Sequence, residues 1–489
     1  MMQAIRLHSR SADDTGCGET GVYGSARGWV GFLLALVIAA PAQGQAKSGP
    51  DLAADNSLTW SGITLYGVVD IGLQYETHGA PFSDYHPAGS ANIVQKNSRQ
   101  SVTGLTPNNM GQSRIGLSAL EPLAGDWALV GRVETFFNPQ SGNISDASKS
   151  MALNNGKTPA TSGTNLNSSV AGQLFQSSYL GFSSRTYGTL TFGRQLTLVA
   201  DGISKYDPNY GSQAFSLIGM SGPYAGAGDT EDKRLDSSVK YNLLLASVFH
   251  VGALYKFNGS NGAANTAFQA QLGAEFAGAS VDAYYSKVNS AISSAPLTAA
   301  MVQGEPVAGF TTCVPSCSVG NNSLAGTISD NTAYALMGLY KLDVFKFFLG
   351  YEYLKFENPS QPLPAGFIDI GGYVLTYVNN NAYVKAKILN VYWGGLRYTP
   401  MPHLDLTVAY YGFHQNSFAT GANAGCSSRV AGACSGNFDD FSFGADYAFT
   451  KRFDAYVGVM YSGVHNGLAN GYDFYTTNLN PTIGMRFKF

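Results

Sequence analysis

The sequence contains the stretch Ile483-Gly484-Met485-Arg486-Phe487-Lys488-Phe489, in which apolar residues occupy every second position. A similar alternation recurs in Ile63–Asp70 and in Thr189–Gly193. Successive side chains of a β-strand point to opposite sides, so a period of two residues predicts strands. One face of these strands is apolar, and the other carries Arg, Lys, Asp, Thr and Gly. The pattern therefore predicts an all-β fold.

The composition argues against several classes of protein. Only 12% of the 489 residues are charged, against about 25% in an average soluble domain. The formal net charge of −3 provides no basic surplus for binding nucleic acid. No run reaches the roughly 18 apolar residues that a membrane-spanning helix needs. A hydrophobic content of 45% also argues against a disordered chain.

Three features favour a transmembrane β-barrel over a soluble sheet with one buried face. The predicted strands come in pairs that are joined alternately by very short and very long segments. Aromatic residues gather at the strand ends. The chain carries a predicted export signal, described below, and the polar face has charges in the middle of strands. Short turns on one side, long loops on the other, aromatic girdles and a wet interior are typical of transmembrane barrels.

The alternation predicts 16 antiparallel strands, with seven tight turns and eight long connections. Bacterial single-chain barrels have even strand numbers, and barrels of this size enclose an aqueous channel. The stretch 366–388 contains further aromatic and apolar residues, so 18 strands is the alternative. The predicted strands are 63–75, 112–119, 127–137, 174–183, 188–195, 235–242, 247–257, 267–276, 280–288, 332–340, 345–356, 388–398, 404–414, 438–448, 453–463 and 479–489.

The N-terminal region predicts an export signal. Arg27 precedes the longest apolar run, Trp29–Ala40, and Ala40-Pro41-Ala42 forms a small-residue cleavage pattern. This order is typical of a secretory signal peptide, whereas a buried strand or helix is the alternative. We predict a signal peptide over residues 1–42 and a single barrel domain over residues 43–489.

The cysteines fit an exported chain. Cys17 lies in the predicted leader, Cys313 and Cys317 share one polar stretch, and Cys426 and Cys434 share another. Two local pairs in polar segments predict two loop disulfides. A zinc site that joins both stretches and two pairs of free thiols are the alternatives.

Several segments resemble the Gram-negative general porins of the β-proteobacterial type. Ile63–Asp70 and Ser113–Leu117 resemble the first two strands of that family. Tyr179–Phe182 and Tyr187–Gln195, which reads Tyr-Gly-Thr-Leu-Thr-Phe-Gly-Arg-Gln, resemble its fourth and fifth strands, and the final Arg-Phe-Lys-Phe is similar to its aromatic C-terminal signature. The resemblance implies a homotrimer of 16-stranded barrels in the outer membrane. It also implies short periplasmic turns, long extracellular loops, and a third long loop that folds into each lumen.

The alternation also indicates which charges face the lumen. Arg114 alternates with Ile115 and therefore points inward, as do Arg132 and Glu134, which alternate with Val133. Arg132 and Glu134 also have the spacing to pair with each other. The alternative to a role in the constriction is that such residues are solvated charges that line the barrel and do not affect selectivity.

By the same resemblance, Arg114 and Arg194 match the basic cluster on the porin wall, and Arg234 matches its third member. Simple alternation places Arg194 on the apolar face with Phe192, so a bulge or the start of the loop would have to turn it inward. The third long loop, about 196–234, is expected to supply opposing carboxylates and so create a transverse field across the constriction. These carboxylates are Asp201, Asp207, Asp229, Glu231 and Asp232.

The expected function is passive diffusion of small hydrophilic solutes and ions through an outer-membrane channel. A substrate-specific channel and a surface adhesin or receptor that uses the long loops are the alternatives. No enzyme activity, cofactor or metal is predicted, because the seven histidines are scattered and the Gly-rich stretches lack a phosphate-binding motif. The expected surroundings and partners are outer-membrane lipid and lipopolysaccharide, further copies of the chain, solutes and ions, without nucleic acid. The preference for anions or cations is left open.

Overall fold

The computed structural model describes residues 58–79, 84–85, 100–157, 174–218, 233–257, 266–313 and 318–489. All of them belong to one compact unit, Leu52–Phe489. The predicted signal peptide, residues 1–42, falls outside the described residues and stays a prediction. Within the described part of the chain, no helix has the length and apolar character to cross a membrane.

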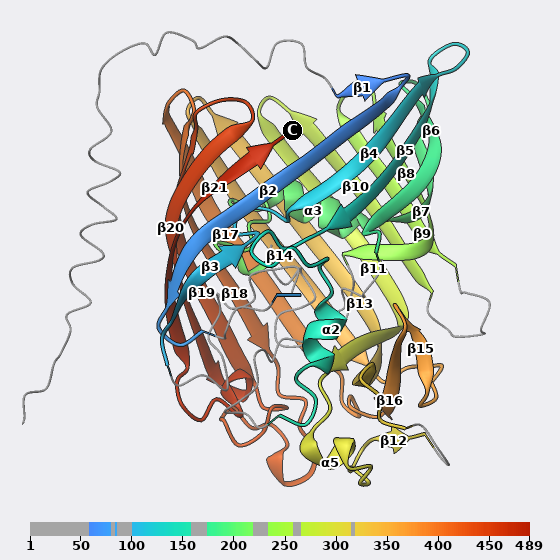
Figure 1. Cartoon of the computed structure of the whole chain (residues 1–489), viewed down its shortest axis with the longest axis vertical. Helices are drawn as coiled ribbons and strands as arrows, with labels where there is room; N and C mark the ends of the chain where they lie inside the picture. Colours follow the sequence, from blue (N-terminus) through green and yellow to red (C-terminus); the bar gives the residue numbers. More distant parts are fainter. Residues whose placement is uncertain are drawn as a thin grey trace, which may run out of the picture. The chain divides into compact units, whose positions relative to one another are not determined.

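The strands form one closed antiparallel barrel with sixteen positions around the ring (Figure 1). We call the strand or strands at each position a stave. Each stave pairs with the next, and β2 closes the ring by pairing with β21, in a register that places Val69 opposite Phe487. The predicted count of 16 strands is therefore confirmed. In ring order the staves are β2 (Ile63–Glu76), β3 (Val102–Pro107) with β4 (Arg114–Pro122), β5 (Trp127–Phe136), β6 (Ser177–Ser184), β7 (Gly188–Leu196), β8 (Arg234–Leu245), β9 (Phe249–Lys256), β10 (Ala267–Phe276), β11 (Ala279–Ala295), β13 (Ser323–Leu342), β14 (Phe345–Glu357), β17 (Lys387–Met401), β18 (Leu404–Gln415), β19 (Gly436–Ala448), β20 (Phe453–Asn466) and β21 (Thr477–Lys488).

The second stave differs from the predicted strand 112–119 because it has two parts. β3 pairs with the second half of β2 and β4 with the first half, so part of a predicted long loop is strand. Residues 108–113 bulge between the two parts. Their position is fixed by Asp70, whose Oδ2 accepts hydrogen bonds from Met110 N at 2.7 Å and Gly111 N at 2.8 Å.

The stretch 366–388 does contain further strands, but they are not barrel staves. β15 (Phe367–Ile370) pairs with β16 (Tyr373–Asn379). β16 pairs in parallel with the start of β13 and antiparallel with β12 (Thr311–Thr312). These strands extend the sheet at the long-loop end of the barrel (Figure 1). The alternative count of 18 staves is therefore wrong.

The barrel wall keeps the alternation of the sequence. Leu272, Phe276 and Leu349 are 65%, 75% and 71% exposed on the outer face, whereas Asp70 and Asp282 are buried on the inner face. Aromatic rings also gather at the short turns; Trp127, for example, stacks on Tyr187 with ring centres 5.8 Å apart. An apolar exterior, aromatic ends and a polar interior are the arrangement that a barrel in a lipid bilayer requires.

The remaining elements are not part of the ring of staves. The two-residue strand β1 precedes β2, and one helix, α3, belongs to the third long loop. Two other helices and two 3-10 turns lie in the other long loops. These elements are β1 (Thr59–Trp60), α2 (Ala147–Ala152), α3 (Leu198–Tyr206), α5 (Ala299–Val302), η2 (Gly421–Asn423) and η3 (Gly467–Ala469).

Candidate pore constriction

The third long loop leaves the end of β7 and turns into the barrel. Thr197 caps α3, because its side chain accepts a hydrogen bond from Ala200 N in the first turn. The apolar face of α3 is buried against the inner side of the staves from β9 to β14. The buried apolar residues of this face include Leu198, Val199 and Ile203. The third loop therefore folds into the lumen, as predicted.

Beyond α3, stave β17 holds the backbone of the loop. Trp393 Nε1 donates a hydrogen bond to Tyr206 O at 3.0 Å, and Arg397 Nη2 donates one to Pro208 O. Gly395 lies between these two donors, and a Cβ there would be 2.4 Å from Pro208 Cγ. The glycine thus permits the close approach of the loop to the wall.

Asp207 completes this attachment. Its carboxylate accepts hydrogen bonds from Tyr411 OH at 2.6 Å and from Gly211 N at 2.7 Å. Asn209 Nδ2 donates to the same Tyr411 oxygen at 2.9 Å. We predicted a pore-facing carboxylate at this position, but Asp207 is 0% exposed. Its carboxylate anchors the loop instead, because the wall supplies the donors that it needs.

Burial raises the pKa of Asp207 above its ordinary value, although the hydrogen bond from Tyr411 acts in the opposite direction. The anchored loop therefore binds a proton more readily than a released loop. Protonation of this carboxyl group therefore stabilises the anchored loop relative to the released loop. This stabilisation is fully present below the ordinary pKa, and it is lost as the pH rises through the raised pKa.

We therefore expect the loop to be anchored more firmly at acidic pH. Open-channel current noise in a planar bilayer should rise as the pH is raised above about 4, the ordinary pKa of an aspartate. The Asp207→Asn variant, which cannot ionise, should lack this part of the pH dependence. The same pH dependence in the variant would contradict the assignment to Asp207.

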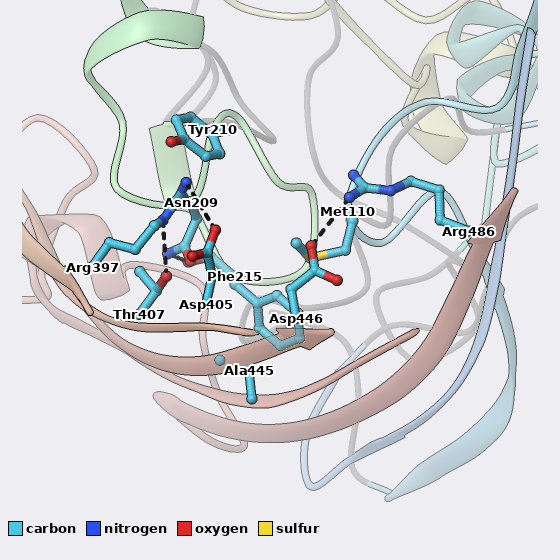
Figure 2. Close-up of a pocket in the computed structure, with 11 residues that line it drawn as sticks. Met110, Asn209, Tyr210, Phe215, Arg397, Asp405, Thr407, Ala445, Asp446 and Arg486 are labelled. Carbon is cyan, nitrogen blue, oxygen red and sulfur yellow. Dashed lines mark hydrogen bonds and ion pairs between the residues drawn. The ribbon is translucent and has the colours of Figure 1, made fainter. Parts of the chain in front are cut away.

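A small pocket lies between the tip of the loop and the wall, as Figure 2 shows. The Arg397 guanidinium lies 3.4 Å from the centre of the Tyr210 ring, and its Nη1 is 3.9 Å from Asp405. On the other side of the pocket, Arg486 pairs with Asp446 at 3.2 Å. The four charged side chains that line this pocket thus form two pairs of opposite charge.

The tip of the loop ends near the second stave. Ser212 Oγ and Ala214 N both donate hydrogen bonds to Asn109 O at 2.8 Å. The Phe215 ring meets the Tyr456 ring edge-on, with centres 6.3 Å apart. The described part of the loop therefore follows the inner wall from β9 to β20. The staves β4 to β8 lie outside this path, and Lys240 of β8 contacts the start of the loop by donating a hydrogen bond to Leu196 O at 3.0 Å.

Two arginines contact one carboxylate on this part of the wall, and a third arginine lies near a tyrosine that also contacts it. Glu134 of β5 lies 3.4 Å from Arg114 Nε and 3.9 Å from Arg234 Nη2. It also accepts a hydrogen bond from Tyr66 OH at 2.9 Å, and the Arg132 guanidinium lies 5.3 Å from the centre of the Tyr66 ring. We call Arg114, Arg132, Arg234 and Glu134 the wall cluster. Glu134 is only 4% exposed, so it joins the arginines more than it lines the opening.

Among the predicted loop carboxylates that the structure describes, Asp201 of α3 is the one on which this cluster acts electrostatically. It pairs with Lys240 of β8, and its side chain is 42% exposed. Arg234 and Arg132 are close enough to act electrostatically on Asp201. The structure thus brings a loop carboxylate and wall cations to the same opening. Three further predicted acids, Asp229, Glu231 and Asp232, lie outside the described residues.

Arg194 takes a different position from the one that the resemblance implies. Its register with β6 places it opposite Ser178, in the same alternation as Phe192 opposite Leu180. Facing residues of an antiparallel pair share a side of the sheet, and Phe192 and Leu180 are exposed on the outer side. A bulge follows Gly193 in the pairing with β8, but it does not move Arg194 to the inner alternation. Arg194 pairs with Asp236, and its side chain is 10% exposed.

Tyr66 and Lys240 were not among the predicted site residues, although both lie on the polar alternation of their strands. A second group of charges, where α3 meets the wall, was not predicted either. Lys205 lies 3.2 Å from Glu275 and 3.6 Å from Asp282. His250 Nδ1 lies 3.0 Å from Asp282. These residues come from distant segments, so strand alternation alone predicts that they face inward but not that they meet.

One predicted cysteine pair is a disulfide. Cys426 and Cys434 are joined, with their Cα atoms 4.8 Å apart. This bond argues against the alternative zinc site, because disulfide sulfurs are not available as thiolate ligands. Cys313 is also disulfide-bonded, and Cys317 lies outside the described residues. The described part of the chain contains no group of three or more His, Cys, Asp or Glu side chains that could hold a metal ion.

The fold and the site together define a transmembrane β-barrel whose lumen is narrowed by an inward-folded loop. The chain belongs to the Gram-negative porin family, which it matches over residues 32–467. This membership and the barrel place the protein in the bacterial outer membrane, with the short turns at the periplasmic end and the long loops at the extracellular end.

Known proteins agree with this assignment. An outer membrane porin protein of Bordetella pertussis is 25% identical over 201 residues, which are 41% of this chain and 43% of that protein. The match thus spans less than half of the length of that relative. The solved anion-selective porin from Comamonas acidovorans has 15% identity and a TM-score of 0.53, covering 87% of this chain and 99% of that one.

OmpT of Vibrio cholerae, an outer membrane protein solved in its trimer form, has 16% identity and a TM-score of 0.51, covering 87% of this chain and 99% of that one. At these identities, the likeness to solved structures shows the fold alone.

Proposed function

We propose that the protein forms a water-filled channel through which small hydrophilic solutes and ions diffuse passively across the outer membrane. The observation that carries this proposal is the constriction. α3 lies in the lumen, and its Asp201 meets Lys240 and faces the arginines of the wall cluster. Low-dielectric walls focus the field of such charges, so solutes would be sorted there by size and charge.

Two alternatives use the same barrel differently. A substrate-specific channel would bind one solute in the lumen, and an adhesin or receptor would work through its loops without flux. Two observations favour a general channel. The charges at the constriction are paired, and the third loop follows one wall, so neither closes the opening with apolar side chains. The porin family and the fold point to a channel rather than to an enzyme.

A liposome-swelling assay distinguishes these functions. We expect reconstituted protein to admit monosaccharides, at rates that rise in proportion to solute concentration and fall steeply with solute size. Saturation by one solute would favour a substrate-specific channel. An absence of swelling with a folded, heat-modifiable barrel would contradict the channel and favour a loop-based binding role.

We also propose a preference for anions. In the wall cluster together with the Asp201–Lys240 pair, four cations accompany two carboxylates. The cations are Arg114, Arg132, Arg234 and Lys240, and the carboxylates are Glu134 and Asp201. This local surplus of positive charge raises the local concentration of anions.

A homotrimer in outer-membrane lipid and lipopolysaccharide is the assembly that we propose. The solved trimer form of the OmpT barrel supports it.

A further inference from the structure

The second long loop contains a strap, Ser145–Lys157, that starts on one side of the lumen. Ser145 Oγ accepts a hydrogen bond from Gln112 Nε2 at 3.2 Å, and Asp146 N donates one to Tyr85 O at 2.6 Å. Gln112 belongs to the bulge at residues 108–113, which also contacts the third loop inside the barrel through Asn109. The strap therefore begins on the lumen side of the wall, next to β4 and β5.

The strap ends on the other side of the ring. Asn155 binds two backbone groups there: its Nδ2 donates to Ser323 O at 2.6 Å, and its Oδ1 accepts from Leu297 N at 2.7 Å. Gly156 N donates to Leu297 O at 2.9 Å. Ser323 begins β13, and Leu297 follows β11.

The middle of the strap is held by apolar packing. α2 places Met151, which is 1% exposed, in a cluster with Leu324 and Ile328 of β13 and Leu375 of β16. The carboxylate of Asp146, which caps α2, accepts a hydrogen bond from Tyr373 OH at 2.8 Å. The extension formed by the ends of β11, β13 and β16 thus serves as the seat of the strap.

The ring order shows what this docking does to the channel. β5 is the third stave and β13 is the tenth of sixteen, so the two lie almost opposite each other. A segment that starts inside the wall at one and is seated at the other crosses the extracellular opening, and Figure 1 shows α2 towards the long-loop end of the barrel. A solute that approaches from outside has to pass beside the strap before it reaches the third loop.

We propose that the strap is an outer size filter, which sets the upper size limit for hydrophilic solutes before they reach the constriction. This inference rests on the proposed channel function and adds a specificity-determining element to it. The strap is fixed to its seat by four hydrogen bonds and one apolar cluster, and therefore stays across the opening without a ligand.

The test is liposome swelling with the full-length Met151→Ala/Asn155→Ala variant. Loss of the buried thioether and of both Asn155 hydrogen bonds should release the strap. We expect uptake of a trisaccharide such as raffinose to rise severalfold relative to the parent, whereas uptake of arabinose changes little. Leu153→Ala is the matched control, because Leu153 lies in the same strap and is 54% exposed. It should leave both rates unchanged.

A reversible crosslink separates release of the strap from damage to the barrel. A Cβ built on Gly156 would lie 3.7 Å from Val302 Cβ, close to the roughly 3.8 Å of a disulfide. We add Gly156→Cys and Val302→Cys to the released variant. Oxidation should restore the parent size limit and reduction should abolish it, although the positive φ of Gly156 imposes some strain.

Each outcome of this experiment bears on a different claim. An unchanged raffinose-to-arabinose ratio in the released variant, or a crosslink that forms without lowering that ratio, would overturn the outer filter while leaving the channel in place. Failure of the parent protein to admit arabinose would instead contradict the proposed function.

Discussion

Replacing Arg114 and Arg132 together with alanine should shift the reversal potential under a salt gradient towards cation preference. Both side chains belong to the wall cluster and face the lumen. A unit charge about 5 Å from a passing ion contributes roughly 0.8 kcal/mol in water, which corresponds to about a fourfold change in ion occupancy. The effect should be largest at low ionic strength, where the charges are least screened.

Arg194→Ala is the matched control for this experiment. It removes the same charge from a residue on the outer alternation of β7, where Arg194 pairs with Asp236. We expect its reversal potential to equal that of the parent. A shift with Arg194→Ala, or no shift with the double variant, would show that the wall cluster does not set the field of the constriction.

Replacing Trp393 with alanine should release the third loop and give larger, noisier channels. Trp393 is 1% exposed, and its Nε1 donates the hydrogen bond that holds Tyr206 O. Removing a buried tryptophan costs about 3–5 kcal/mol. Because the ring fills the space between the wall and the loop, we expect this loss to weaken the attachment of the loop more than the strand pairing of the barrel. Single-channel recording measures both the conductance and the open-channel noise.

Trp60→Ala serves as the comparison, because Trp60 is 55% exposed in the short strand β1, outside the ring of staves. It should leave conductance and noise unchanged. Heat-modifiable migration on a gel should show that the barrel still forms in both variants. A parent-like current from a folded Trp393→Ala barrel would mean that the loop is held by other contacts or does not narrow the channel.

The barrel was predictable because its strands obey one local rule. Lipid on one side and water on the other force apolar and polar residues to alternate, as in Ile483–Phe489, and tight turns mark the strand pairs. The same rule placed Arg114, Arg132 and Glu134 inside and correctly put Arg194 with Phe192 on the outer alternation. The resemblance implied an inward position for Arg194, whereas its register with β6 keeps the outer alternation.

The features that the sequence did not predict depend on contacts between distant segments. β3 and β16 are strands only because β2 and β13 offer them an edge. Asp207 looks like a solvated loop acid until the fold brings Tyr411 to it, 204 positions along the chain. The path of the third loop likewise depends on the close approach of Pro208 to Gly395, which no local pattern indicates.

The central claim is that the barrel is an open channel with a charged constriction, and single-channel recording tests it most directly. The refolded protein would be placed in a planar bilayer with a salt gradient across it. We predict steady, stepwise currents that appear in groups of three, with a reversal potential on the anion-selective side. No current from a correctly folded, heat-modifiable barrel would contradict the channel itself, and a cation-selective current would contradict the assigned field of the constriction.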